Sequence, residues 1–402
     1  MSNDLSNYYE KIKALKSSPL FHMSLGAMEL FHSNFWRWLM EYNVKYVKVF
    51  FKDLENVVKE EIKIKREYKH TDISIEVNGK YYLIENKIKS LVDEEQLERY
   101  ADDFKDNFIE GKYIFPFEVV LEKEKNKSKW GFLNYNTILD DIDDITDSII
   151  KESKEEDINY NIIKEYTNMT RNLMYIIDYA IKEFYGNKFI LANKNDELYN
   201  SLIDIRIYDI VRKINCSLLK KKLEERLKKE FNDLYEKITI EQGFSNGQAS
   251  LSARWKIQYD DEDESKGHFL IGPQLQDRQF KTMIHICTKY FGIENLKSKS
   301  KKTIDDTLEK MYHSVEQDIF RKYESYYKSR FKKEYNEYKG NHDKFEYVAL
   351  YKYNRVDNYK NNDCEIDLSN FDNLCNEFIE SLKLFKDVDR DKLIKSIKDG
   401  LA

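Results

Sequence analysis

Residues 70–88 read HTDISIEVNGKYYLIENKI, and the fold is decided in this stretch. Two apolar and β-branched runs, 71–77 and 80–88, flank the dipeptide Asn78-Gly79. Asn-Gly between two such runs is the strongest short signal for a hairpin, because a tight two-residue turn needs positive φ at both central positions. We therefore predict two antiparallel strands joined by a tight turn.

Helical and strand-like segments alternate on both sides of this hairpin. We predict a strand at 60–68 and an amphipathic helix at 93–108, where apolar residues recur at helical spacing. Further strands are predicted at 111–122 and 129–135. Helical spacing also predicts a helix at 28–42. The apolar residues of that helix are Leu30, Phe31, Phe35, Trp38 and Leu39.

The rest of the chain is expected to be mainly helical. Helices are predicted in 137–190, in 195–238 and after residue 300. Between them, 243–275 contains two strand-like runs. The Gly/Ser-rich segment 243–252 lacks a phosphate-loop spacing such as GxxxxGK[ST], so we predict a turn-rich connection there.

The length of 402 residues exceeds what one compact core usually holds, since domains cluster near roughly 100 to 150 residues. We place a boundary between 180 and 200. This gives an α/β domain over 1–190 and a mainly helical α+β domain over 191–402, which would bind a substrate or a partner. The content of 41% hydrophobic and 14% aromatic residues, with only 3 Pro, excludes collagen-like and Pro-rich disordered classes.

The charge and the apolar runs limit the partners and the compartment. The net charge of −6 lacks the basicity typical of nucleic-acid binders, so such contacts are expected only at local surfaces. No apolar run reaches the roughly 18 residues of a membrane span, and the N-terminus lacks an apolar signal segment. We therefore expect a cytoplasmic protein without membrane contact. The 4 cysteines are scattered without CxxC pairs, which argues against a zinc cluster or a disulfide framework.

The segment 320–339 interleaves tyrosines with Arg and Lys. Base stacking and neutralisation of backbone charge would suit nucleic acid there. A helix that buries its tyrosines and exposes its lysines explains the same pattern and is the more common case.

Asp72, Glu85 and Lys87 have the chemistry of a hydrolytic metal site. Side chains alternate along a strand, so Glu85 and Lys87 point the same way while Asn86 faces opposite. Asp72 lies on the adjoining strand, where a bend could bring its carboxylate to Glu85. Two carboxylates suit Mg²⁺. A neighbouring lysine with a lowered pKa could orient a water and help to deprotonate it for attack on phosphorus.

A simple ion pair would explain the same residues without catalysis. Glu85 and Lys87 follow the apolar run YYLI, however, so they extend a strand that is expected to be buried. Burying them without a partner would cost several kcal/mol, and a metal site is one remedy.

The segment 70–88 resembles the D-x(n)-E-x-K signature of the PD-(D/E)XK nuclease superfamily. QLERY (96–100) resembles the QxxxY motif of its exonuclease-like branch. ELFHSNFWRWLM (29–40) is similar to the first helix of poorly characterised bacterial families of the superfamily. The resemblance covers about residues 25–136, and no proline precedes Asp72 in this chain.

This resemblance implies a four-stranded mixed sheet flanked by helices, in the order αβββαβ. It implies that Asp72 and Glu85 bind Mg²⁺, with Mn²⁺ as a substitute. Glu29 and the main-chain carbonyl of Asn86 would add further oxygen ligands. Lys87 would position or activate the water and stabilise developing charge.

Four further residues are weighed beside this set. Gln96 and Tyr100 lie one helical turn apart, and the resemblance implies that they support the site or contact substrate. Core packing of Tyr100 and solvent exposure of Gln96 explain the pattern equally well. His32 and His70 are weaker candidates for a general base, because a lone histidine is more often packed or on the surface.

Arg66 precedes the hairpin, on the strand predicted at 60–68. Its guanidinium suits a phosphate contact or an ion pair with a neighbouring carboxylate.

The leading functional hypothesis is a Mg²⁺-dependent nuclease that cuts DNA. The resemblance suggests a role in bacterial restriction or anti-phage defence. A second hypothesis is a non-catalytic nuclease-fold module for binding or assembly, whose second half contacts a protein partner. The same site would also serve RNA cleavage or branched-DNA resolution. A homodimer is expected if both strands of a duplex are cut.

Overall fold

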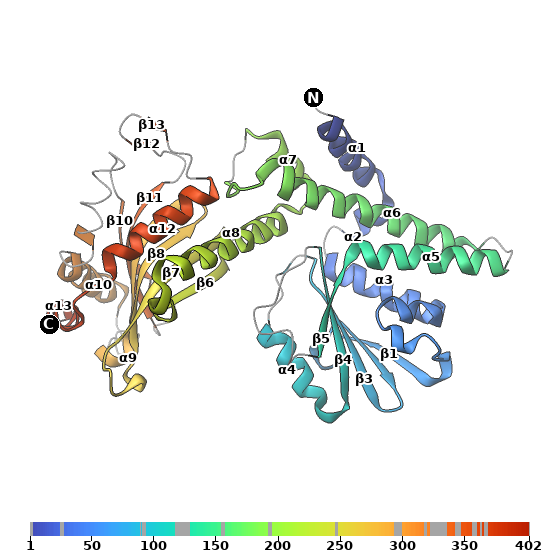
Figure 1. The fold of residues 1–402 in the computed structure, drawn as a ribbon, viewed down its shortest axis with the longest axis horizontal. Coiled ribbons are helices and arrows are strands. Elements are labelled where there is room, and N and C mark those ends of the chain that lie inside the picture. The colour runs from blue at the N-terminus through green and yellow to red at the C-terminus, as the bar shows by residue number, and fades with distance from the viewer. Residues whose placement is uncertain are drawn as a thin grey trace. The chain divides into compact units, whose positions relative to one another are not determined.

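The structure is a computed structural model that forms two compact units (Figure 1). Unit 1 comprises Met1–Gly186 and Lys194–Ile214, and unit 2 comprises Asn187–Asn193 and Asn215–Ala402. Residues 194–214 therefore pack with unit 1 although they follow the predicted boundary. The described residues are 3–24, 28–88, 90, 94–116, 129–153, 157–191, 195–245, 248–292, 300–316, 320–321, 336–341, 347–355, 360–361, 364–365 and 369–401.

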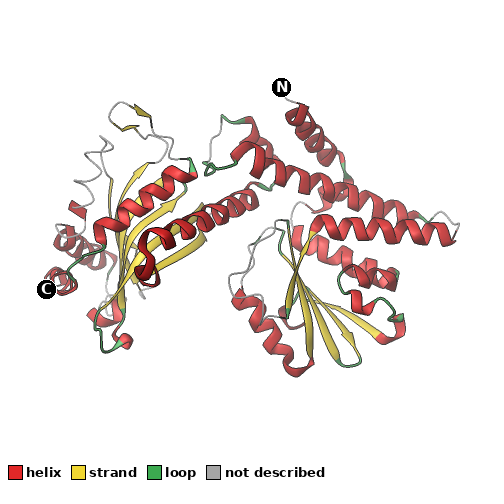
Figure 2. Cartoon of the chain, in the orientation of Figure 1, coloured by secondary structure: helices red, strands yellow, loops and turns green. Residues whose placement is uncertain are grey.

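Unit 1 contains a mixed sheet of five strands in the order β1-β2-β3-β4-β5. Figure 2 draws the strands in yellow. The strands are β1 (Ile62–Arg66), β2 (Ile73–Val77), β3 (Lys80–Asn86), β4 (Phe108–Phe115) and β5 (Trp130–Asn134). β1, β2 and β3 are antiparallel neighbours, whereas β4 and β5 run parallel to β3. The predicted mixed sheet is confirmed, and β5 adds a fifth strand to the four that the resemblance implied.

The β2–β3 hairpin turns at the predicted dipeptide. Asn78 has a φ of 51° and Gly79 a φ of 75°, as a two-residue turn of this kind requires. The turn fixes the register, which pairs Val77 with Lys80 and Ile73 with Ile84. This register determines which side chains lie side by side at the open end of the hairpin.

Helices flank both faces of this sheet (Figure 1). α4 (Glu94–Phe104) packs on the face that carries Leu83, with Leu97, Tyr100 and Phe104 in a shared apolar cluster. α3 (Met28–Tyr42) and α5 (Tyr135–Ser153) contact the opposite face, where they hydrogen bond to Asn86. The other helices that begin in unit 1 are α1 (Asn3–Ser17), α2 (Pro19–Ser24), α6 (Ile158–Tyr179), α7 (Glu197–Asp204) and α8 (Tyr208–Phe231).

The buried side of α3 differs from the predicted one. Leu30 is 42% exposed, whereas His32 and Trp36 are 1% and 0% exposed. Phe35 and Leu39 are buried as predicted. Apolar residues occur nearly all round this helix, so their spacing alone could not show which side packs on the sheet.

Unit 2 contains a six-stranded antiparallel sheet in the order β10-β11-β9-β8-β7-β6. Its strands are β6 (Ile238–Ser245), β7 (Gln248–Gln258), β8 (His268–Gln276), β9 (Gln279–Cys287), β10 (Asn336–Asn341) and β11 (Tyr347–Arg355). One face packs in an apolar core with α8, α10 (Lys301–Val315), α12 (Phe371–Phe385) and α13 (Arg390–Leu401). The α+β class of this region is confirmed.

The described chain after residue 300 is largely helical, as predicted, and also supplies β10 and β11. One detail of the second half was predicted wrongly. The segment 243–252 contributes to β6 and β7 and is more than a turn-rich connection. Most of the Tyr-rich stretch 320–339 lies outside the described residues. In the described part of the chain, no helix is long and apolar enough to span a membrane.

The remaining elements are short. They are α9 (Thr288–Phe291), β12 (Lys360–Asn361), β13 (Cys364–Glu365), η1 (Val44–Val49), η2 (Lys52–Leu54), η3 (Lys59–Glu61), η4 (Tyr68–His70), η5 (Lys105–Asn107), η6 (Ala180–Tyr185), η7 (Asn232–Lys237) and η8 (Glu264–Lys266).

Replacing Gly79 by alanine tests the hairpin turn. No atom lies within 4 Å of the position that the new Cβ would take, so the cost should come from the φ of 75° alone. We expect Gly79→Ala to lower the free energy of unfolding by about 1 kcal/mol in urea denaturation. The exposed variant Lys80→Ala serves as a control. Equal stability of Gly79→Ala and the parent would contradict this account of the turn.

Candidate active site

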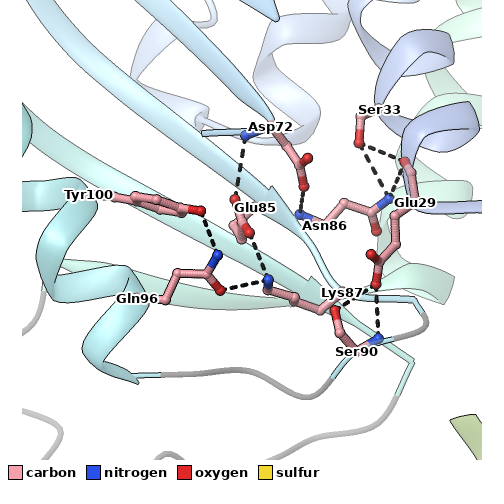
Figure 3. Close-up of polar contacts among 9 residues, drawn as sticks. All are labelled: Glu29, Ser33, Asp72, Glu85, Asn86, Lys87, Ser90, Gln96 and Tyr100. Carbon is pink, nitrogen blue, oxygen red and sulfur yellow. Dashed lines mark hydrogen bonds and ion pairs between the residues drawn. The ribbon is translucent and has the colours of Figure 1, made fainter. Parts of the chain in front are cut away.

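The open end of the β2–β3 hairpin brings Asp72 next to Glu85. Ile73 pairs with Ile84, so Asp72 comes level with Glu85 one residue further along. The Asp72 N–H donates to Glu85 Oε2 at 3.4 Å, and the Asn86 N–H donates to Asp72 Oδ2 at 2.7 Å (Figure 3). The two carboxylates are thus held together by the main chain itself.

Lys87 completes a chain of contacts that ends on α4. Its ammonium lies 2.8 Å from Glu85 Oε1 and donates to Gln96 Oε1 at 2.8 Å. Gln96 Nε2 in turn donates to the Tyr100 hydroxyl at 2.5 Å (Figure 3). The structure therefore places Gln96 and Tyr100 beside Lys87. Tyr100 also packs in the apolar cluster under α4, as the packing alternative predicted.

Glu29 reaches the site from α3, but its carboxylate is turned to the loop after β3. Glu29 Oε1 accepts from the Ser90 N–H at 2.9 Å and from Ser90 Oγ at 2.7 Å. The Glu29 main-chain carbonyl accepts from Asn86 Nδ2 at 2.9 Å. Sequence reasoning missed Ser90, because nothing in the sequence relates the loop to the first turn of α3.

Asn86 anchors the end of β3 to the opposite face of the sheet. Its side chain is 1% exposed, and its Oδ1 accepts from the Tyr135 hydroxyl on α5. The hydrogen bonds of the side-chain amide therefore hold the end of β3 against the neighbouring helices. The predicted role of the Asn86 main-chain carbonyl as a metal ligand stays a prediction.

Arg66 ties β1 and α3 to Asp72. Its Nε donates to the Asp72 main-chain carbonyl at 3.0 Å, and its NH1 group donates to Leu30 O at 3.4 Å and to Asn34 Oδ1. A loose ion pair with Glu67, at 3.8 Å, adds to these contacts. The guanidinium thus positions the main chain around the acidic residues.

The two candidate histidines lie outside this constellation. His32 is buried in the apolar core, where its Nδ1 forms a hydrogen bond of 2.7 Å with the Tyr166 hydroxyl. Burial lowers the pKa of His32 to about 3, so it stays neutral. His70 is exposed in the turn before β2. These placements match the packed and surface positions that are common for lone histidines.

Burial sets the electrostatics of the site. Burial raises the pKa of Glu85 to about 7, and the neighbouring charge of Asp72 adds to this shift. Burial likewise raises the pKa of Asp72. Burial alone would lower the pKa of Lys87, but the charge and hydrogen bond of Glu85, with the charges of Glu29 and Asp72, raise it overall. The expected lowered pKa of this lysine is therefore wrong while it is paired with Glu85.

The donor set fits a hard divalent cation. Mg²⁺ is usually held by one or two carboxylates and several waters, and Asp72 and Glu85 offer such a pair. Burial raises the pKa of both acids, and a bound cation would stabilise their ionised forms. Within the described ranges, no three His, Cys, Asp or Glu side chains already converge on one point. Glu29 would have to leave Ser90 to become a third ligand.

Comparison with protein families identifies this part of the chain. Residues 20–172 match the model of the PD-(D/E)XK nuclease superfamily. The matched segment contains the whole set from Glu29 to Tyr100. Nucleases of this superfamily generally use divalent metal ions. Searches of curated proteins and of solved structures found no match.

The raised pKa of Glu85 predicts how metal binding depends on pH. A metal ion must displace the proton, so the apparent Mn²⁺ affinity should rise by up to about tenfold per pH unit below pH 7 and level off above it. Titration calorimetry at several pH values measures this. Without metal, the folded chain should lose stability as pH rises from 4.5 to about 7, because it holds the proton more tightly than the unfolded chain.

Glu85→Gln is the matched control for this pH series. It keeps the shape of the side chain but cannot ionise, so its residual metal binding should lack this pH dependence. An Mn²⁺ affinity of the parent that stays constant from about pH 5.5 to about pH 8.5 would contradict the electrostatic account.

Proposed function

We propose, from the membership of residues 20–172 in the PD-(D/E)XK nuclease superfamily, that the chain is a Mg²⁺-dependent nuclease that hydrolyses phosphodiester bonds of DNA. The observation that carries the proposal is the convergence of Asp72, Glu85 and Lys87. The half-buried Asp72, the buried Glu85 and the Lys87 amine meet where two strands end, and Asp72 is hydrogen bonded to the main chain of β3. Such a set can hold a cation and face a phosphate at the same time.

Each residue has a separate task in this proposal. Asp72 and Glu85 would hold the ion, together with the Asn86 carbonyl and with Glu29 once its carboxylate leaves Ser90. A bound Mg²⁺ or Mn²⁺ would acidify a water and neutralise phosphate charge.

Lys87 acts as a fixed cation and not as a base. Because its pKa is raised, Lys87 stays protonated near neutral pH. When a metal ion takes Glu85, the ammonium is free to donate to the attacking water or to a phosphate oxygen. Gln96 keeps this ammonium in place through its Oε1, and the Tyr100 hydroxyl orients the Gln96 amide.

A non-catalytic binding module is less well supported. Two carboxylates whose pKa values are raised by burial cost the fold stability, and a purely structural role does not need them. Cleavage of RNA or of branched DNA would use the same chemistry as cleavage of other DNA. Only cleavage assays with each substrate can distinguish these alternatives. The role in bacterial defence rests on the resemblance, the homodimer on the need to cut both strands of a duplex, and the protein partner on the acidic net charge and the unassigned second half; all three stay predictions.

Substitutions at Glu85 and Lys87 test the proposed site. We expect Glu85→Gln and Lys87→Met each to reduce the initial rate of plasmid cleavage by about a hundredfold or more, because a metal ligand or the fixed cation is lost. The assay uses plasmid, linear and single-stranded DNA, and RNA, with Mg²⁺, Mn²⁺ or EDTA.

Glu76→Gln is the matched control for these substitutions. Glu76 lies in the same sheet on β2 but forms ion pairs with Lys63 and Lys65, away from the site. This variant should cleave at the parental rate. Circular dichroism confirms that each variant is folded. Cleavage that survives both Glu85→Gln and Lys87→Met would exclude the assigned site.

A further inference from the structure

The Asn86 side chain lies on the face of β3 opposite to the site. Side chains alternate along a strand, so Asn86 points away from Glu85 and Lys87, towards α3 and α5. It is buried on that face. Any effect of this side chain on a cation or a substrate must therefore pass through the main chain of β3.

The main chain of Asn86 faces Asp72. Its N–H donates to Asp72 Oδ2 at 2.7 Å. The N–H and C=O of one strand residue point to the same edge of the strand, so the Asn86 carbonyl also faces this edge. Regular pairing of β3 with β2 ends at Ile84. The separation between the Asn86 main chain and Asp72 is therefore not fixed by strand pairing with β2.

Three elements meet at the side-chain amide of Asn86. Its Nδ2 donates to the Glu29 main-chain carbonyl on α3 at 2.9 Å, with a longer contact of 3.5 Å to Ser33 Oγ (Figure 3). Its Oδ1 accepts from the Tyr135 hydroxyl on α5. A main-chain carbonyl can only accept, so Nδ2 must face Glu29 and Oδ1 must face Tyr135. The partners thus determine the orientation of the amide.

The Tyr135 ring is held in place by its packing. Tyr135 is the first residue of α5 and is fully buried. The ring centroids of His32 and Trp36, both on α3, each lie 5.6 Å from the centroid of the Tyr135 ring. These neighbours restrict the tyrosine, so its hydroxyl stays directed at Asn86. A side chain that is locked in this way can position the residue to which it is hydrogen bonded.

We propose that Tyr135 and the Asn86 side chain are positioning residues of the cation site. Their hydrogen bond fixes the end of β3 against α5, and so keeps the Asn86 main chain at the separation from Asp72 that a shared cation requires. Neither side chain touches the ion. Removal of the tyrosine hydroxyl loosens the end of β3 but leaves every candidate ligand in the chain. The inference rests on the proposed function and adds to it a residue that contacts no reacting group.

Tyr135→Phe tests this role, with Tyr46→Phe as the matched control. Tyr46 is also fully buried, and its hydroxyl forms a hydrogen bond of 2.8 Å with Thr146 Oγ1. Thr146 lies on the same helix as Tyr135, roughly 16 Å further along α5. Each variant removes one buried hydrogen bond of a tyrosine hydroxyl, so urea unfolding should show similar losses of stability in both.

Metal affinity separates the two variants. Calorimetric titration with Mn²⁺ should show an affinity about tenfold or more below the parental value in Tyr135→Phe, and the parental affinity in Tyr46→Phe. The cleavage rate of Tyr135→Phe should recover towards the parental rate when Mn²⁺ is raised above the weakened Kd, because the ligands themselves are intact. The rate of Glu85→Gln should not recover in this way.

Hydrogen exchange gives a second readout that needs neither metal nor activity. In the metal-free chain, the main-chain amide hydrogen of Asn86 is held by the Asp72 carboxylate. Peptides that cover residues 80–88 should exchange faster in Tyr135→Phe than in the parent and in Tyr46→Phe, because the end of β3 is loosened.

An Mn²⁺ affinity of Tyr135→Phe equal to that of Tyr46→Phe would overturn the proposal, whether both are parental or both are lowered. Equal exchange of residues 80–88 in the two variants would overturn it as well. Loss of cleavage in Glu85→Gln with parental Mn²⁺ affinity in Tyr135→Phe would remove only this inference. Absence of Mn²⁺ binding in the parent would remove the proposed function too.

Discussion

A buried carboxylate and a half-buried one beside a single ammonium group are the constraint on which the site depends. The pairing of β2 with β3 holds Asp72 and Glu85 together, and Lys87 pairs with Glu85 at 2.8 Å. Burial raises the pKa of both acids, so keeping them ionised costs the fold free energy. A cation that binds here recovers this free energy. The burial that weakens the fold therefore strengthens the binding of a cation.

The scaffold around the hairpin keeps the acids from separating. Arg66 joins β1 and α3 to the main chain of Asp72, and Tyr135 joins α5 to the side chain of Asn86. Breaking the buried hydrogen bond between Tyr135 and Asn86 would cost about 1–3 kcal/mol. These contacts use the main chain and uncharged groups near the acids. None of these scaffold contacts uses a carboxylate oxygen of Asp72 or Glu85.

Local sequence patterns were enough to predict the hairpin. Features that depend on tertiary contacts could not be predicted from the sequence. Asn78-Gly79 specifies its turn through the φ values that the two residues adopt, so the strands and their register followed from a short segment. Which side of α3 is buried, and with it the burial of Trp36, depends on the elements that α3 packs against. The orientation of the Glu29 side chain towards the loop after β3 depends on its hydrogen bond with Ser90, which is distant in the sequence.

The position of a bound Mn²⁺ ion tests the central claim most directly. An anomalous difference map from a crystal soaked with Mn²⁺ should show a peak within about 2.5 Å of carboxylate oxygens of both Asp72 and Glu85, with Lys87 withdrawn from Glu85. A peak elsewhere in the chain, with Glu85 still paired to Lys87, would contradict the account.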